Sequence, residues 1–339
     1  MALSNQDDYQ SGVITMSART ALITGGTSGI GKATAEVLHK RGYRVAVTGQ
    51  RLESVARARE ELPEEVLVLQ ADARSLTATD EVISEVGARF GSLTTLFLNA
   101  GVSRPMTLDT FDEAAYDEVF AVNTKGQFYT LAKALPLLSD GASVIVTVGI
   151  GATRSLTGNS VTAGSHGAFL GMIPTLALEL APRRIRINAV SPGFTDTPMT
   201  RASLREISDD AAAAMAAIAE KNPFGRLAES EDIARTVAYL ASDDAAYVTG
   251  QEIMVAGAQG WLSDQAVGNR THFYEHVRDT RVEPDCPRRR HDSAGHLEPG
   301  SGCKDAAHHR GSGVASQRLR LLPRDAHVRV VRTQWHVER

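Results

Sequence analysis

The 339-residue sequence has only 2 cysteines and 5% aromatic residues, and it offers no apolar run long enough to predict a membrane span. Both cysteines, Cys286 and Cys303, follow Gly260, so residues 1–260 cannot hold a disulfide framework. The acidic start MALSNQDDYQSG also lacks the basic and apolar regions of a secretory signal. These absences predict a soluble, cytoplasmic protein without a membrane partner.

Excess positive charge is also absent from most of the chain. The formal net charge is −4, and residues 1–260 carry 22 basic and 30 acidic side chains, whereas residues 261–339 carry 14 and 10. A negative balance offers no general attraction to nucleic acid, so none is expected as a partner. The last part lacks apolar periodicity and contains PRRRH and AHHRGSG, which predicts a basic tail of little stable structure over 261–339.

The tail also holds a set of candidate zinc ligands. They are Cys286, His291, His296, Cys303, His308 and His309. They lack a Cys-x-x-Cys pair with a His-x₃₋₅-His pair opposite it, which is the usual spacing of a tetrahedral zinc site. We therefore predict no metal site.

Apolar residues form a regular alternation of strands and helices from residue 19 to about residue 260. Buried strands are predicted by the runs TALITGG, YRVAVTG, EVLVLQADA, LTTLFLNAG, ASVIVTVG and RIRINAVSPG. Helices are predicted by the segments between them, such as KATAEVLHKRG. This alternation is typical of a doubly wound α/β domain, in which helices cover both faces of a parallel sheet. We predict one such domain over 19–260, after a flexible leader over 1–18.

A glycine-rich turn connects the first of these strands to the first helix. It is Thr24-Gly25-Gly26-Thr27-Ser28-Gly29-Ile30-Gly31, and the helix continues from Lys32. Glycines let the backbone turn tightly and approach a pyrophosphate, whose charge is favoured by the free N–H groups and the dipole at a helix N-terminus. An ordinary closely packed loop is the alternative, but the position between a first strand and a first helix favours dinucleotide binding.

Further motifs follow the turn in order. They are Ala71-Asp72-Ala73, Asn99-Ala100-Gly101, Val122-Asn123-Thr124-Lys125-Gly126, RINAVSPG from Arg186 to Gly193, Thr197-Pro198-Met199 and YVTGQ from Tyr247 to Gln251. With these motifs, the segment from about Arg19 to Gly260 resembles the short-chain dehydrogenase/reductase family. The resemblance implies a Rossmann-like fold, a nicotinamide dinucleotide cofactor and oxidoreductase activity on a small molecule.

The resemblance also implies which residues contact the cofactor. Asp72 accepts a hydrogen bond from the adenine amino group, Asn99 begins the adenosine side, and the segment from Pro192 to Thr197 holds the nicotinamide end. The whole set is Gly25, Thr27, Ser28, Gly29, Ile30, Gly31, Arg51, Asp72, Ala73, Asn99, Ala100, Gly101, Asn123, His166, Pro192, Gly193, Thr195 and Thr197. Asp72 as a helix N-cap and Asn99 as a bridge between strands are the alternative interpretations.

The end of the second strand bears on the choice between NAD(H) and NADP(H). An acidic residue there bonds the ribose hydroxyls of NAD and repels the 2′-phosphate of NADP, but this chain has Gly49 at that position and Arg51 two residues later. We therefore predict NADP(H) over NAD(H), with Arg51 as the phosphate partner. Arg51 as a solvated residue at a helix start is the alternative, because Ser28 stands where the family often has a second basic residue.

The catalytic positions depart from the family. The family uses a Tyr as the acid, a Lys four residues later and a Ser thirteen residues before the Tyr. Counting back from the LALEL motif puts Thr162, His166 and Gly149 at these three positions. No tyrosine or lysine occurs from 134 to 220, so no shift of the alignment restores the pair. Of the family's catalytic set, only Asn123 remains.

Asn123, Thr162 and His166 are therefore the candidate catalytic residues. The hydroxyl of Thr162 has no useful acidity near pH 7. His166, with an ordinary pKa near 6.5, suits proton donation. A hydrogen bond from His166 to the cofactor, or packing on its helix, is the alternative interpretation.

These features predict an NADP(H)-dependent oxidoreductase with a non-standard active site. We predict reduction of a bulky carbonyl, an enone or an iminium in a specialised, secondary-metabolite biosynthesis. Such a site works best where the slow step needs no proton transfer, as in hydride addition to an iminium, a quinone-like acceptor or an activated enone. A Met- and Ala-rich segment between Thr197 and Pro223, in the place of the family's substrate lid, suits a bulky apolar substrate. The alternatives are a dinucleotide-binding protein without redox turnover and a partner subunit of a catalytic relative. The resemblance also implies a homodimer or homotetramer.

Overall fold

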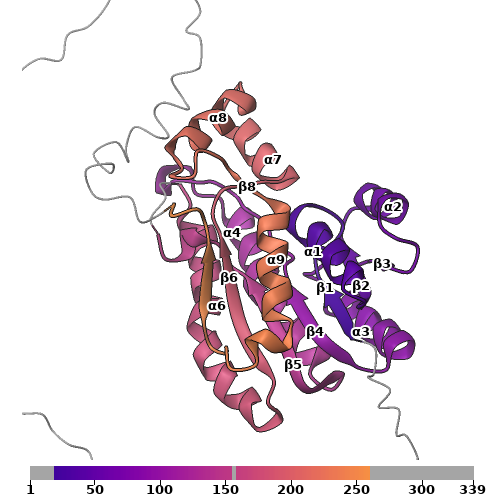
Figure 1. The fold of residues 1–339 in the computed structure, drawn as a ribbon. Coiled ribbons are helices and arrows are strands. Elements are labelled where there is room, and N and C mark those ends of the chain that lie inside the picture. The colour runs from indigo at the N-terminus through magenta and orange to yellow at the C-terminus, as the bar shows by residue number, and fades with distance from the viewer. Residues whose placement is uncertain (1–18, 155–157, 260–339) are drawn as a thin grey trace, which may run out of the picture. The chain divides into compact units, whose positions relative to one another are not determined.

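The computed structural model describes residues 19–154 and 158–259 of the chain (Figure 1). The predictions for the leader 1–18 and for the tail 261–339, with its candidate zinc ligands, lie outside these residues. Within the described part, the predicted doubly wound α/β fold is confirmed.

Seven parallel strands form one sheet in the order β3-β2-β1-β4-β5-β6-β9. They are β1 (Thr20–Ile23), β2 (Arg44–Gly49), β3 (Leu67–Gln70), β4 (Leu93–Leu98), β5 (Leu138–Thr147), β6 (Arg186–Pro192) and β9 (Glu252–Val255). The first six are the predicted strands. The sequence did not single out β9, an edge strand whose four residues are only half-buried. Two further short strands, β7 (Thr195–Asp196) and β8 (Ala228–Glu229), pair with each other.

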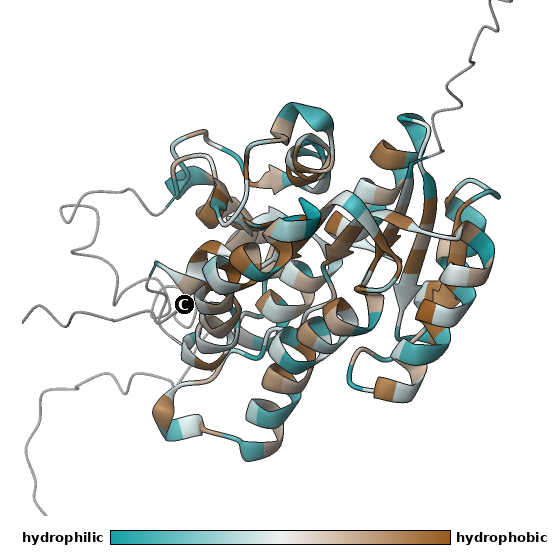
Figure 2. Cartoon of the chain, turned by 90° about the horizontal axis from the view of Figure 1, so that it is seen from below, coloured by the Kyte–Doolittle hydropathy of each residue, from teal (hydrophilic) through white to brown (hydrophobic). Residues whose placement is uncertain are grey.

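Helices cover both faces of the sheet. They are α1 (Gly29–Lys40), α2 (Leu52–Glu61), α3 (Leu76–Phe90), α4 (Glu113–Phe120), α5 (Gln127–Ala134), α6 (Ser160–Leu180), α7 (Pro198–Ile207), α8 (Ala211–Lys221) and α9 (Ser230–Leu240). Buried side chains of α1, α2 and α9 belong to one apolar core, and those of α3, α5 and α6 belong to another. In Figure 2 the strands between the helices are largely brown, in keeping with a sheet that is buried on both faces.

The two cores are separated by the alternation of side chains along each strand. In β1, Leu22 packs into the core of α3, α5 and α6, whereas Ala21 and Ile23 pack into the core of α1, α2 and α9. All three side chains are 0% exposed. Successive side chains of a strand point to opposite faces, so a continuous apolar run supplies both cores.

One helix is longer and more apolar than the sequence analysis allowed for. The segment Ser160–Arg183, which contains α6, is long and apolar enough to cross a membrane by length and composition alone. In the fold one face of it packs on the sheet, where Phe169, Ile173 and Leu180 are buried and α6 contacts β6, although only 28% of the apolar window is buried. The segment is therefore weak evidence for a membrane span.

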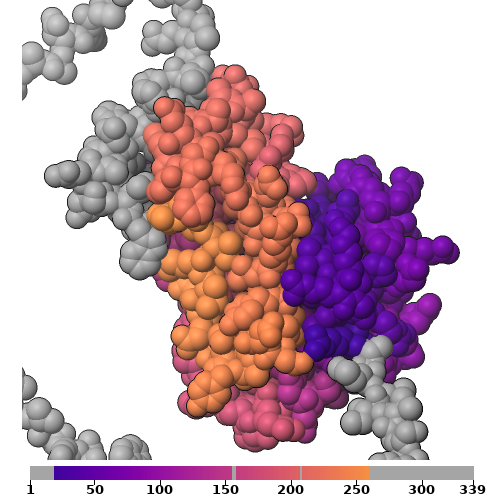
Figure 3. All heavy atoms as spheres, viewed as in Figure 1, coloured from indigo at the N-terminus to yellow at the C-terminus, as the bar shows by residue number. Residues whose placement is uncertain are grey.

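The carboxyl ends of the seven parallel strands lie at one edge of the sheet, and the strand order reverses between β1 and β4. A crevice at such a switch point is the usual ligand site of an open α/β sheet. Helices α7 and α8 follow β6 and rise above the N-terminal half, as the salmon and indigo spheres of Figure 3 show. The fold thus predicts a site bounded by the loops of the sheet and by α7.

Candidate cofactor-binding and active site

A cavity of about 910 Å³ opens at the carboxyl ends of the strands. The loops after β1 to β6 and residues of α7 line it. All the predicted cofactor and catalytic residues lie along this cavity except Gly31 and Asn123. The structure therefore brings together residues that are up to 172 positions apart in the chain, from Gly25 to Thr197.

The glycine-rich turn forms one wall of the cavity. Gly25 has φ +63° and Gly29 has φ +53°, a left-handed conformation that favours glycine. Helix α1 begins at Gly29, and its N-cap residue Ser28 makes no side-chain capping bond. The first N–H groups of α1 are therefore not capped by that side chain, which suits an anion. Gly31 does not line the cavity. It allows α1 to pack closely on Gly25 and Asn99, because a Cβ at residue 31 would lie against the backbone oxygen of Gly25 and 2.7 Å from Nδ2 of Asn99.

Asn99 ties the ends of three strands together beside this turn. Its Nδ2 donates to the backbone oxygens of Thr24 at 3.2 Å and Gly25 at 3.1 Å, and its Oδ1 accepts from Oγ1 of Thr147 at 3.1 Å. The backbone N–H groups of Asn99 and Ala100 both donate to Oγ1 of Thr24 at 3.0 Å. Asn99 thus has the bridging role that the sequence left open, and it also lines the cavity.

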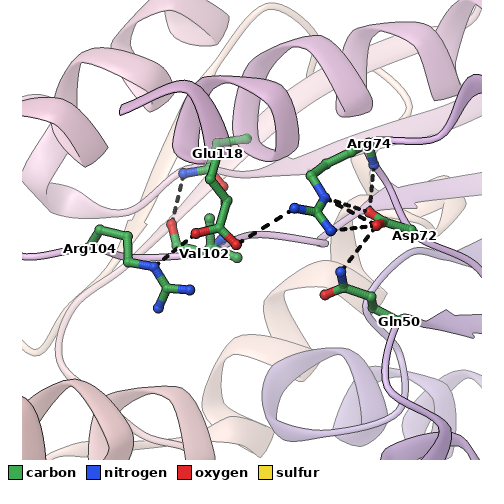
Figure 4. Close-up of polar contacts among 7 residues, drawn as sticks. Gln50, Asp72, Arg74, Val102, Arg104 and Glu118 are labelled. Atoms are coloured by element: carbon green, nitrogen blue, oxygen red, sulfur yellow. Dashed lines mark hydrogen bonds and ion pairs between the residues drawn. The ribbon is translucent and has the colours of Figure 1, made fainter. Parts of the chain in front are cut away.

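Asp72, after β3, is held in an ion pair rather than at a helix N-cap. Its two oxygens accept from Nε and Nη2 of Arg74, and Oδ2 also accepts from Nε2 of Gln50 at 3.2 Å. Figure 4 shows Arg74 between Asp72 and Glu118, with Arg104 on the other side of Glu118. The hydrogen bonds from Arg74 lower the pKa of Asp72, so the carboxylate is ionised at neutral pH.

The end of β2 leaves no room for an acidic side chain. A Cβ at Gly49 would lie 2.5 Å from Cγ2 of Thr27, which is far inside normal contact. Thr27 is buried, and its Oγ1 donates to Oγ of Ser54 at 3.3 Å. Arg51 follows as the N-cap residue of α2, with an exposed side chain along the cavity. Arg51 therefore places a positive charge two residues after the position at which an acidic residue would bind NAD.

Thr162 and His166 lie one turn apart on α6 and face the same cavity. Oγ1 of Thr162 is buried and has no hydrogen-bond partner among the described residues. Burial lowers the pKa of His166 to about 4, so its imidazole is neutral at pH 7. The structure therefore does not support the predicted role of a protonated His166 as the acid. A neutral imidazole retains one N–H that donates a hydrogen bond.

Gly149, after β5, lies opposite His166. It has φ +112°, and a Cβ there would lie 3.8 Å from Nδ1 of His166. There is space for a small side chain, but the backbone conformation is one that residues other than glycine rarely adopt. A serine at this position would therefore have space for its side chain but a strained backbone.

Asn123 is 0% exposed and is not among the residues that line the cavity, so its catalytic and cofactor-binding roles stay predictions. It lies in a π-helical turn, Ala121–Gly126, between α4 and α5. Its Oδ1 accepts from N of Val102 at 2.8 Å, and its Nδ2 donates to O of Val102 at 2.9 Å and to Oγ of Ser165 at 3.1 Å. All three bonds are to other residues of the chain, so the amide of Asn123 joins the loop after β4 to α6.

The comparisons with known proteins agree with this geometry. A family model described as Enoyl-(Acyl carrier protein) reductase matches residues 25–258. The 3-oxoacyl-(acyl-carrier-protein) reductase FabG of Staphylococcus epidermidis is 36% identical over 246 residues, which cover 70% of this chain and 98% of the relative. The chain belongs to the short-chain dehydrogenase/reductase family.

Other members of the short-chain dehydrogenase/reductase family show the same likeness. Levodione reductase of Leifsonia aquatica is 33% identical over 250 residues, which cover 71% of this chain and 94% of the relative. A crystal structure of a levodione reductase matches with a TM-score of 0.67 and 31% identity, covering 72% of this chain and 98% of that one. A short-chain dehydrogenase/reductase structure from Brucella melitensis, titled glucose/ribitol dehydrogenase, matches with a TM-score of 0.66 and 30% identity over 72% and 97%.

The predicted lid segment is divided between two roles. Residues of α7, including Met199 and Glu206, line the cavity. The alanine-rich helix α8 does not; Ala214 and Ile218 pack against Leu204 in a small core of their own. The Met- and Ala-rich pattern therefore reflects packing, and α7 is the helix that faces a substrate.

Several cavity residues were not found by sequence reasoning. Gln127, Arg104 and Glu118 line it, and none belongs to a motif that marks a binding role. Ser165 supports the site from behind, because its Oγ donates to O of Thr162 at 2.7 Å. Among the described residues there is no group of three His, Cys, Asp or Glu side chains that could hold a metal ion.

Proposed function

We propose that the chain is an NADP(H)-dependent reductase of a small molecule, with a non-standard active site. One arrangement carries the proposal: a complete dinucleotide cradle beside a helix face that bears Thr162 and a neutral His166. Relatives named 3-oxoacyl and levodione reductases support the reduction of an oxo compound or a similar acceptor.

The described residues fit NADPH along the whole cavity. The uncapped start of α1 would hold the pyrophosphate, Arg51 the 2′-phosphate, and the segment from Pro192 to Thr197 the nicotinamide end. When bound, NADPH supplies a hydride for transfer to an electrophilic carbon. The protein's contribution is to hold that carbon in contact with the donor, which is worth an effective molarity of about 10⁵–10⁸ M in favourable cases.

Thr162 and His166 would contact the oxygen on which negative charge develops. Neither side chain has a recorded hydrogen-bond partner in the described part of the chain, and the buried Oγ1 of Thr162 would meet a substrate only after a local shift of its side chain or of α6. A hydroxyl and a neutral imidazole stabilise such an oxygen by hydrogen bonds but are poor proton donors. Substrates that need no proton from the protein are therefore favoured: an iminium, an activated enone, or a bulky carbonyl with its own acidic group.

The proposal is tested by stopped-flow oxidation of NADPH with panels of ketones, enones and iminium ions. We expect turnover with at least one class. Thr162→Val should slow turnover of the best substrate by about 10- to 100-fold, since one hydrogen-bond donor to a developing charge is lost. NADPH that binds but is not consumed with any panel would contradict reductase activity.

The second candidate is a dinucleotide-binding protein without redox turnover, as a regulator, a non-redox catalyst or a partner subunit. The observation that favours it is the composition of the cavity: of the residues described, no tyrosine and no lysine lines it. Fluorescence titration with NADPH separates the two candidates, because binding without consumption supports the second.

We further propose that the protein acts in the cytoplasm, in a specialised biosynthetic step, as a homodimer or homotetramer. Apolar side chains are exposed on α5 and α6, where Phe128 is 40% and Leu178 77% exposed. Burial of such side chains in a second copy would remove them from water. The mass of the native assembly tests this, and a monomer at micromolar concentration would contradict it.

A further inference from the structure

Arg104, in the loop between β4 and α4, lines the cavity with two nitrogens that no other residue uses. Its Nε donates to Oε2 of Glu118 at 2.9 Å, and its side chain is 42% exposed. No described residue is recorded as a partner of its Nη1 or Nη2. Figure 4 shows both of these nitrogens turned away from Glu118. The guanidinium therefore offers two neighbouring N–H groups that a ligand in the cavity can reach.

The loop that carries this arginine is tied at both ends to α6. Both backbone groups of Val102 bond to the side chain of Asn123, which in turn donates to Oγ of Ser165 on α6. At the other end of the loop, N of Met106 donates to O of Gly158, two residues before α6 begins. Because α6 also bears the two candidate catalytic side chains, the arginine lies on the substrate side of the cavity.

A row of charged side chains orients the guanidinium. The row runs from Asp72 through Arg74 and Glu118 to Arg104, as Figure 4 shows. Asp72 is at the adenosine end of this row, so Arg104 is at the end that points away from the adenosine half. The bond between Nε and Glu118 holds the guanidinium in place before a ligand arrives, and this lowers the entropy that binding costs.

The other charges on the substrate side fit a ligand with one negative charge. The loops after β4 and β5 contribute Arg104 and Arg154 to the cavity wall, and α4 and α7 contribute Glu118 and Glu206. These four charges balance, so a doubly charged ligand such as a phosphate monoester would leave one charge without a partner. Two parallel N–H groups of a guanidinium match the two oxygens of a carboxylate.

Apolar side chains line the same side of the cavity and can contact the body of a substrate. They are Ile150, Phe194 and Met199.

We propose that the substrate carries a carboxylate, which binds Nη1 and Nη2 of Arg104 while its apolar body lies along the cavity. This rests on the proposed function, since the hydride donor decides where the reacting carbon must lie. The substrate class is therefore an acid with an apolar body that also bears the oxo, enone or iminium group. Arg104 binds the carboxylate and so positions the reacting carbon, without taking part in the chemistry.

The test titrates the NADPH complex with hexanoate and with hexanamide, its uncharged counterpart, by isothermal titration calorimetry. At about 0.05 M salt, hexanoate should bind about 5- to 20-fold more tightly, because water weakens a partly exposed ion pair without abolishing it. This preference should shrink at about 0.5 M salt. In Arg104→Gln, whose amide can still donate to Glu118, the ratio of the two dissociation constants should fall to about 1 or below.

Arg205→Gln is the matched control. Arg205 lies on α7, is exposed and does not line the cavity, so this variant changes the net charge equally and should keep the preference for hexanoate. Hexyl phosphate is the second control ligand, and it should bind no more tightly than hexanoate because the wall holds no further unpaired positive charge.

Each result decides for or against the carboxylate site. Equal binding of hexanoate and hexanamide to wild type, no detectable binding of hexanoate, or an unchanged ratio in Arg104→Gln would overturn it and leave the proposed function intact. Tighter binding of hexyl phosphate than of hexanoate, or an equal loss of preference in Arg205→Gln, would overturn it as well. Absence of NADPH binding to wild type would overturn both proposals.

Discussion

Replacing Arg51 by alanine should weaken the binding of NADPH far more than the binding of NADH. Arg51 lines the cavity directly after β2, its side chain is exposed, and no described residue is recorded as a hydrogen-bond or ion-pair partner of its guanidinium. Its guanidinium is therefore available for the 2′-phosphate, which NADH lacks. Binding of NADH should change by less than 2-fold or so, because the rest of the cradle is untouched.

The size of the effect follows from the exposure of Arg51. Two unit charges 4 Å apart interact by about 1 kcal/mol in bulk water and by about 4 kcal/mol at an effective dielectric constant near 20. A hydrogen bond to a charged group contributes about 1.5–3 kcal/mol. We therefore expect a loss of about 1–3 kcal/mol for NADPH, which corresponds to a 5- to 150-fold rise in its dissociation constant. The loss should shrink as salt is raised from 0.05 to about 0.5 M.

Fluorescence titration of both cofactors measures this directly, with Arg57→Ala as the matched control. Arg57 lies on the same helix, is exposed and does not line the cavity, so its removal changes the net charge equally. An equal loss for NADPH and NADH in Arg51→Ala, or an equal effect of the two arginine variants on NADPH, would refute Arg51 as the phosphate partner.

Three other changes test the catalytic side of the cavity. Gly149→Ser should lower the free energy of unfolding in urea by about 1–2 kcal/mol, because φ is +112° at this residue. The control is Gly171→Ser, at a glycine with open space around it, which should lower the free energy of unfolding by less than half of that amount. Thr162→Val should leave the free energy of unfolding unchanged or raise it by about 1 kcal/mol, since a buried unpaired hydroxyl is removed, and a large loss would show that the hydroxyl is bonded. The pKa of His166 is lowered from 6.5 to about 4, so between these pH values the unfolded chain binds a proton that the folded chain does not bind. The free energy of unfolding should therefore fall, by up to about 3 kcal/mol, as the pH is lowered from 6.5 to 4. His166→Gln should remove that part of the pH dependence, and identical urea profiles at pH 4.5 and 6.5 for wild type would contradict it.

Most of the sheet was predictable because local pattern and tertiary environment agree there. Strands β1 to β6 are short apolar runs between turn residues, and burial on both faces requires such runs. The edge strand β9 was missed because it is only half-buried and begins with Glu252, which weakens its apolar pattern. The division of 197–223 into α7 and α8 was also missed, since composition alone does not tell which of two helices faces a cavity.

The candidate site was predictable as far as backbone conformation defines it. The glycine-rich turn has a fixed relation to the strand and helix around it, so spacing alone located it. The partners of Asn123, Asp72 and Gln127 were not predictable, because they are backbone groups of loops 20 or more positions away for Asn123 and Gln127, and an ion pair within a turn for Asp72. Burial likewise decided the protonation of His166, and burial is a property of the folded chain.

Gly49 and Thr27 occupy one another's space, and this couples two positions that are far apart in the gene. A mutation that placed a carboxylate at 49 would meet the methyl group of Thr27 before it met any ribose. A switch of nucleotide preference would thus require a smaller residue at 27 first, a change that brings no new contact of its own. Residues 27 and 49 would therefore have to change together before an acidic side chain could enter at the end of β2.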